Sequence, residues 1–127
     1  MNNIKFQYLY RDASNYKKWA DVVFSNDEGL SIDAVMKAVR DGLSRDALFL
    51  AHQVRLPEVF LFAEYHLTPD DHCFHEFYSV EVTSDVPDDP YSRSIRQFVT
   101  EVATEARRGW LAFDPQDLSV RLSVSKR

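Results

Sequence analysis

The side chains in this 127-residue chain that are best suited to binding are aromatic rings and arginines. Flat rings stack on nucleobases at roughly 1–3 kcal/mol per base, and an arginine fork binds phosphate through charge-assisted hydrogen bonds. Any one such ring is more often part of a core, and an arginine near a helix end also suits the helix dipole, so only the set indicates a site. The set consists of Tyr8, Tyr10, Trp19, Phe74 and Phe77 with Arg11, Arg55, Arg107 and Arg108.

A second group could bind a metal or move protons. It comprises His66, His72, Cys73, His75 and Glu76. Its spacing does not match the zinc-helix pattern, which places two histidines four residues apart on a helix. We therefore expect a structural or pH-responsive role and no metal ligand. The pair His75 and Glu76 is the basis of a weaker hypothesis, a hydrolase.

The remaining candidates for catalysis are two pairs of adjacent acids, Asp70–Asp71 and Asp88–Asp89. Each pair lies beside a proline in an expected turn, where solvated carboxylates are usual. The chain also lacks a nucleophile elbow, a phosphate loop and a G-x-G-x-x-G fingerprint. We therefore predict a protein that is not an enzyme and that carries no cofactor.

The element that must position the aromatic and basic residues is an expected β-hairpin. Residues 4–11 and 19–24 form its strands, and a polar turn that contains Asp12, Ser14 and Asn15 joins them. Alternation along the first strand makes one face aromatic and the other mostly polar. The turn gathers Lys17 and Lys18 with Arg11 between aromatic rings, a mixture that suits an anionic ligand with rings.

The spacing of apolar residues predicts the other elements. Residues 47–51 are a buried strand or a helix extension, and periodicity cannot decide between them. The expected elements are a helix over 32–43 with Ser31 as N-cap, strands over 58–67 and 72–83, a connector over 85–90, a helix over 93–108 with Ser92 as N-cap and Gly109 as C-cap, and a final strand or partner-ordered tail over 118–124.

This order predicts a single α+β domain over residues 1–127, with an antiparallel β-sheet and two α-helices packed on one face. The other face would stay open, which suits ligand binding or self-association. The net charge of −5 argues against general DNA or RNA binding. A single cysteine and the lack of a signal peptide or an apolar span predict a cytoplasmic protein without membrane partners.

The segment Tyr-Arg-Asp-Ala-Ser-Asn-Tyr-Lys at residues 10–17, followed by Val-Val-Phe at 22–24, resembles small phage-encoded proteins of the first Thoeris anti-defence family. The resemblance implies a protein that sequesters cyclic ADP-ribose isomers, made by defence TIR enzymes, without cleaving them. Some members of that family also bind cyclic di- or trinucleotides, and they assemble as dimers or hexamers.

The resemblance also implies roles for particular residues. Trp19 and either Phe74 or Phe77 would stack on adenine, and Asn15 would shape the turn. The residues that would contact phosphates and ribose are Arg11, Arg55, Arg107 and Arg108, and the choice between the last two stays open. The alternative is a small bacterial interaction, immunity or regulatory protein without a nucleotide ligand, which would use the same aromatics at a protein interface.

Overall fold

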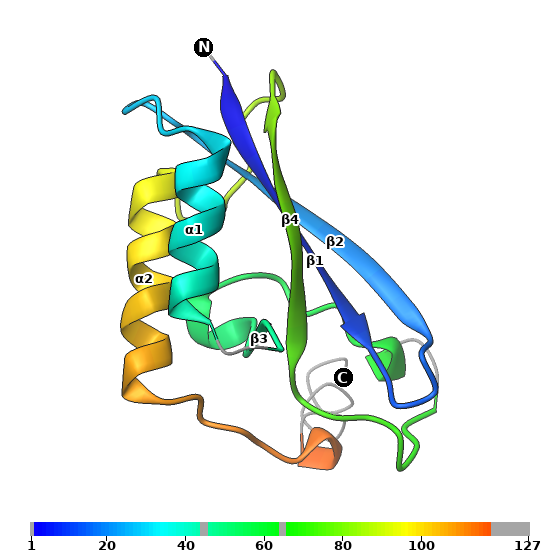
Figure 1. Ribbon diagram of the computed structural model, residues 1–127. Helices are drawn as coiled ribbons and strands as arrows, with labels where there is room; N and C mark the ends of the chain where they lie inside the picture. The colour runs from blue at the N-terminus through cyan, green and yellow to red at the C-terminus, as the bar shows by residue number, and fades with distance from the viewer. Residues whose placement is uncertain (1, 44–45, 64–65, 118–127) are drawn as a thin grey trace.

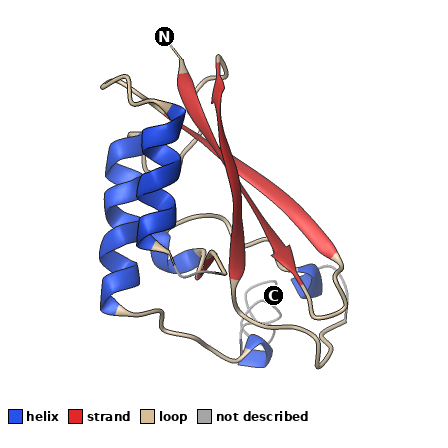
Figure 2. Ribbon diagram, viewed as in Figure 1, coloured by secondary structure: helices blue, strands red, loops and turns tan. Residues whose placement is uncertain are grey.

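The protein is an antiparallel four-stranded sheet with two α-helices side by side on one face (Figures 1 and 2). The computed structural model describes residues 2–43, 46–63 and 66–117. Its strands lie in the order β2-β1-β4-β3. The α+β class and the packing of both helices on one face confirm the prediction. In chain order the elements are β1 (Asn3–Arg11), β2 (Lys17–Phe24), α1 (Ile32–Gly42), β3 (Leu48–Phe49), the 3-10 helices η1 (His52–Val54) and η2 (Leu61–Ala63), β4 (His75–Thr83) and α2 (Ile95–Arg108).

Strands β1 and β2 form the predicted hairpin, and β2 begins two residues earlier than expected. Their register runs from the pair Ile4–Phe24 to the pair Arg11–Lys17. In the turn, the Asp12 carboxylate accepts a hydrogen bond from the Tyr16 N–H at 2.9 Å, and Asn15 adopts a left-handed φ of 70°. Short polar side chains therefore close the hairpin as the sequence indicates.

The core lies between the sheet and the helices. Phe6 on β1 stacks on Phe77 of β4 at 5.1 Å between ring centroids, and Phe24 on β2 stacks on Phe98 of α2 at 4.4 Å. The helix α1 begins as predicted, because the Ser31 hydroxyl accepts a hydrogen bond from the N–H three residues later. These buried aromatics fix the sheet to the helices.

Strand β4 contains an irregularity that the simple alternation of residues 72–83 missed. The register against β1 shifts between Gln7 and Tyr8, so that Tyr8 faces Phe77 whereas Gln7 faces Ser79. The bulge inserts Tyr78 as an extra residue, and an extra residue reverses the faces of everything beyond it. Simple alternation over residues 72–83 would place Tyr78 and Val80 on one face, but Val80 is buried and Tyr78 is 56% exposed.

Two stretches between α1 and β4 bear on the sequence predictions. One decides between two open alternatives, and the other contradicts a predicted strand. The open alternative over residues 47–51 is a short strand, β3, which pairs with β4. The prediction of a strand over 58–67 is wrong for the described residues of that range, which are coil and the 3-10 helix η2. The physical reason is that Phe60 and Phe62 are buried against Tyr10 in a second small core. Val59 and Leu61 also pack against this core. Because side chains from both sides of the predicted strand pack into this core, the segment does not form a strand with a single buried face.

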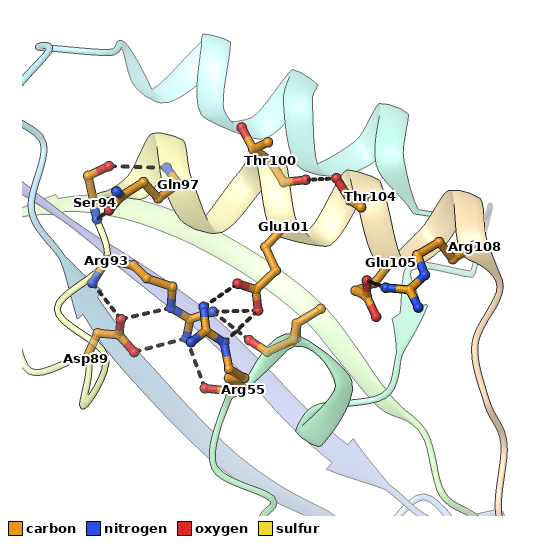
Figure 3. Close-up of polar contacts among 11 residues, drawn as sticks. Arg55, Asp89, Arg93, Ser94, Gln97, Thr100, Glu101, Thr104, Glu105 and Arg108 are labelled. Atoms are coloured by element: carbon orange, nitrogen blue, oxygen red, sulfur yellow. Dashed lines mark hydrogen bonds and ion pairs between the residues drawn. The ribbon is translucent and has the colours of Figure 1, made fainter.

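Helix α2 begins later than predicted, at Ile95 rather than Arg93. Its N-cap is Ser94, not Ser92, because Ser94 and Gln97 form a reciprocal capping box that satisfies two backbone N–H groups (Figure 3). Gly109 is its C-cap as predicted, and its N–H donates to the Glu105 carbonyl. None of the helices in the described part of the chain is long and apolar enough to cross a membrane.

The connector before α2 is anchored by a buried ion pair, so the expectation that Asp89 is solvated is wrong. The Arg93 guanidinium donates to both Asp89 carboxylate oxygens at 2.9 and 3.0 Å, and to the Val54 carbonyl at 2.7 Å (Figure 3). It also donates to the carbonyl of Arg55 and to Glu101. Burial alone raises the pKa of Asp89, but hydrogen bonds from Arg93 outweigh it and lower the pKa below its usual range.

The segment after α2 contacts both cores. Trp110 packs against the main core and Phe113 against the second core, while Leu111 stays exposed. The final strand or tail expected over residues 118–124 lies outside the described residues.

Removing the buried guanidinium should destabilise the fold. In Arg93→Met, Asp89 becomes a buried unpaired charge, so we expect the free energy of unfolding to fall by about 3–5 kcal/mol in urea titrations followed by circular dichroism. The control is Arg96→Met, because Arg96 pairs with Glu28 on the surface, where such pairs contribute about 0–1 kcal/mol. Equal, small losses in both variants would contradict this account.

Candidate binding site on the open face of the sheet

The face of the sheet that the helices do not cover carries an exposed aromatic pair. Leu9 on β1 pairs with Trp19 of β2 on one side and with Glu76 of β4 on the other, so these three side chains share the open face. The bulge brings Tyr78 onto the same face, where its ring meets Trp19 edge to face at 4.8 Å. Leu9 has no exposed surface, yet Trp19 and Tyr78 remain 53% and 56% exposed. Two large rings are thus held in place and still accessible.

The residue next to this pair along β1 is Arg11, whose guanidinium is fixed from two sides. Its Nε and Nη2 donate to the two Glu76 carboxylate oxygens at 3.2 Å each, and its Nη1 donates to the Asn15 side-chain oxygen. A guanidinium has five N–H groups, so two of them have no partner among the described residues. Because Arg11 is 37% exposed, those two groups can reach a ligand.

A hollow of about 500 Å³ adjoins Arg11. This volume is in the range of small-molecule sites. Phe74 and Leu48 give it a partly apolar wall, whereas three carboxylates give it negative charge. Its lining residues are Arg11, Asp12, Ala13, Asp46, Leu48, His72, Phe74 and Glu76. An anionic group would therefore have to enter close to Arg11, away from the acids.

A somewhat larger hollow of about 540 Å³ also involves the hairpin turn, together with residues of the 61–71 segment. It is rich in acids, but these are already bonded within the protein: Ser14 donates to Asp70, and the Tyr10 hydroxyl donates to Asp71 at 2.6 Å. Size alone would favour this hollow. We favour the surface around Arg11, because it combines a guanidinium with exposed rings.

The structure divides the residues that the sequence analysis singled out. It places Arg11, Asn15, Trp19 and Phe74 at the same end of the sheet, around the open face and the hairpin turn. Phe77 lies on the opposite face, buried and stacked on Phe6. Of the two phenylalanines, Phe74 is thus the one that lines a hollow.

The other three arginines lie away from this surface. Arg55 binds Glu101 of α2 (Figure 3), and its guanidinium lies 4.5 Å from the centre of the Tyr91 ring. Arg108 pairs with Glu105 on the same helix. Arg107 lines a shallow hollow between the ends of α1 and α2. Within one chain, none of them adjoins Trp19 or Arg11.

Sequence reasoning missed two residues of the surface, Glu76 and Tyr78. Glu76 was grouped with the histidines, and Tyr78 was not among the candidate residues. Only the pairing of β1 with β4 reveals that Glu76 lies beside Arg11, and only the bulge exposes Tyr78. An isolated sequence carries no clear signal for either fact.

The histidines have structural positions. His75 is fully buried on the inner face, and its Nε2 accepts a hydrogen bond from the Val59 N–H at 3.0 Å. His72 bridges the Arg11 carbonyl and the Phe74 N–H through its two ring nitrogens. His75 and Glu76 lie on opposite faces of β4, so the two side chains of the hydrolase hypothesis do not meet in one site. The described residues contain no group of three His, Cys, Asp or Glu that could hold a metal ion.

Comparison with known proteins adds no relative. No protein-family model, no curated protein and no solved structure matches this chain. Support for a function therefore comes from the geometry of the site and from the sequence resemblance of the hairpin.

The buried histidine makes stability depend on pH. Burial, then the charges of His72 and His52, lower the pKa of His75 to about 3. The unfolded chain binds this proton near pH 6.5 and the folded chain does not, so stability falls as pH drops from about 6.5 toward 3. We expect a slope of up to about 1.4 kcal/mol per pH unit from this group, measured by urea unfolding between pH 7 and 5.

The control for that measurement is His75→Phe, which replaces the titrating imidazole with an apolar ring at the same buried position. Its stability should be lower at pH 7, because the Val59 N–H loses its acceptor, but flatter between pH 7 and 5. A variant that follows the parent slope in this range would show that His75 is not responsible.

Proposed function

We propose that the protein binds a cyclic nucleotide on the open face of its sheet and keeps it unchanged, so that it sequesters a signal and blocks host antiphage defence. The observation that carries the proposal is the exposed Trp19–Tyr78 pair beside a guanidinium that Glu76 and Asn15 hold in place. These groups match the two chemical parts of a nucleotide, its base and its phosphate.

The stacking half of the proposal depends on the two exposed rings. Trp19 and Tyr78 are half exposed, so part of their apolar surface is in contact with water. A bound base would cover that apolar surface. Each stacked base contributes roughly 1–3 kcal/mol. Because the two rings meet edge to face, a base can lie on either one while it contacts the edge of the other.

The phosphate half depends on Arg11. A side chain that Glu76 and Asn15 already orient loses little rotational freedom when a ligand binds, so more of the interaction appears as affinity. Glu76 also neutralises part of the positive charge. The surface therefore suits a ligand with few phosphates and large rings better than a highly charged polyphosphate or a nucleic acid.

The ligand class comes from the resemblance. The segment that resembles the Thoeris anti-defence proteins is the hairpin turn itself, which contributes Arg11 and Asn15 to this surface. We therefore propose a cyclic ADP-ribose isomer as ligand, with cyclic oligonucleotides as further ligands, and action in the host cytoplasm. The same resemblance supports a homo-oligomer, which would let Arg55, Arg107 or Arg108 of a second copy approach the site.

A second candidate function uses the same surface. Trp, Tyr and Arg are the residues most enriched at the energetic centres of protein interfaces. The Trp19–Tyr78 pair with Arg11 would serve an immunity or regulatory protein equally well, and such a protein would show no nucleotide ligand.

One experiment separates these functions. The protein is incubated with cyclic ADP-ribose isomers and cyclic dinucleotides, and its melting temperature is measured. The ligand released on heat denaturation is then identified by mass spectrometry. A nanomolar ligand corresponds to about 12 kcal/mol, so saturation should raise the melting temperature clearly. Intact released ligand supports the proposal. Altered ligand would make the protein an enzyme, and no shift with any ligand would favour a protein partner.

Substitutions on the open face should weaken this binding selectively. We expect Trp19→Ala and Arg11→Ala each to raise the Kd by roughly 5- to 150-fold in calorimetric titrations, which corresponds to the loss of a stack or a charged contact. The matched control is Arg96→Ala, since Arg96 is half exposed on α2 and pairs only with Glu28 among the described residues. An unchanged Kd in both site variants would place the ligand elsewhere.

A further inference from the structure

The outer edge of β2 has backbone groups that face away from the sheet. Just before the strand begins, the Tyr16 carbonyl accepts a hydrogen bond from the Asp12 N–H across the hairpin. The backbone N–H and C=O groups of the even-numbered residues of β2 therefore point toward β1. At the other end Val23 bonds outward, with its N–H to the Asp88 carboxylate at 2.7 Å and its carbonyl to the Asp88 N–H at 3.0 Å. Since backbone directions alternate along a strand, the N–H and C=O groups of Lys17, Trp19 and Asp21 also point outward.

This edge is covered only in part. Asp88 closes it at Val23, but no other described residue bonds to the outward backbone groups of Lys17, Trp19 and Asp21, and all three residues are exposed. Figure 1 shows β2 at the edge of the sheet, and the first half of the strand lies on the side away from the helices. An exposed strand edge is a template for one more antiparallel strand.

The charges along this edge are self-complementary. Two β2 strands that pair antiparallel with Trp19 opposite Trp19 place Lys17 of each copy directly opposite Asp21 of the other. All three side chains lie on the open face, because their partners on β1 are Arg11, Leu9 and Gln7. Opposite charges directly across an antiparallel pair are favourable, and like charges are not.

Neighbouring registers fit less well. A shift by two residues in one direction places Lys17 opposite Val23, whose backbone Asp88 already occupies. The same shift in the other direction places Lys17 opposite Trp19 and Asp21 opposite Asn15, which loses both charge pairs. Both the free length of the edge and its charges therefore select the pairing centred on Trp19.

We propose that β2 pairs with β2 of a second copy of this chain about a two-fold axis at Trp19, so that two sheets become one continuous eight-stranded sheet. The interface is isologous, as in most dimers. It brings the two Trp19–Tyr78 surfaces together on one face. The pairing uses backbone and charge alone, so it goes beyond the proposed ligand and does not depend on it.

The test is a charge swap measured without any ligand. The parent protein should sediment as a dimer in analytical ultracentrifugation, and Lys17→Asp or Asp21→Lys alone should raise the dimer dissociation constant at least about tenfold, because each places two like-charged pairs across the axis. The double variant, Lys17→Asp with Asp21→Lys, restores opposite charges and should restore the dimer. The control is Lys37→Asp on α1, which should leave the dimer unchanged.

Three results would overturn the proposal: a parent protein that is monomeric at about 100 µM, a dimer that neither single variant weakens, or a double variant that stays as weak as the single ones while its circular dichroism matches the parent. Nucleotide binding is measured separately by the melting shift. A monomer that binds nucleotide would refute this interface alone, and a dimer that binds none would refute the proposed function alone.

Discussion

The pairing of β1 with β4 is the constraint on which the rest of the structure depends. These strands are far apart in sequence, and their register decides what lies on each face of the sheet. On the inner face it stacks Phe6 on Phe77, which begins the core against the helices. On the open face it places Glu76 beside Arg11, and its bulge turns Tyr78 toward Trp19. One register therefore builds both the core and the binding surface.

The aromatic residues of β1 also join this sheet to the loops below it. Tyr8 and Tyr10 bury their rings but keep their hydroxyls bonded, Tyr8 to the Pro57 carbonyl and Tyr10 to Asp71, each at 2.6 Å. Burial is the first cause that raises the pKa of both tyrosines, so each remains a donor at any physiological pH. His72, which lines the hollow near Arg11, donates its backbone N–H to the Tyr10 hydroxyl at 3.1 Å, so the contacts of Tyr10 help to shape the candidate site.

The elements that the sequence predicted correctly are those with a local signal. The hairpin, α1 and α2 follow from alternation, turn residues and the three-four spacing, and Ser31 and Gly109 mark helix ends. The errors lie where distant contacts decide. Phe60 and Phe62 look like alternate residues of a strand but fill a second core around Tyr10. Ser92 was expected to be the N-cap of α2 and Asp89 a solvated turn residue, yet the N-cap is Ser94 with its capping box and Asp89 is paired with the buried Arg93.

The candidate site shows the same division. Arg11, Asn15 and Trp19 could be grouped from sequence because one hairpin carries them all. Glu76 and Tyr78 could not, since their positions depend on a register and a bulge that only the folded sheet defines. Arg55, Arg107 and Arg108 were grouped by residue type alone, and the fold places them on the helix side of the molecule or at the helix ends.

The central claim is that the nucleotide binds on the open face of the sheet and not on the helix side of the same chain. The two tryptophans allow a direct test, because Trp19 lies on that face whereas Trp110 packs against the core on the helix side. The measurement is a titration of ¹⁵N-labelled protein with a cyclic ADP-ribose isomer, in which the two indole N–H resonances are followed by NMR. The account predicts that the Trp19 signal moves to saturation while the Trp110 signal stays in place. A ligand that moves Trp110 and leaves Trp19 unchanged would contradict it.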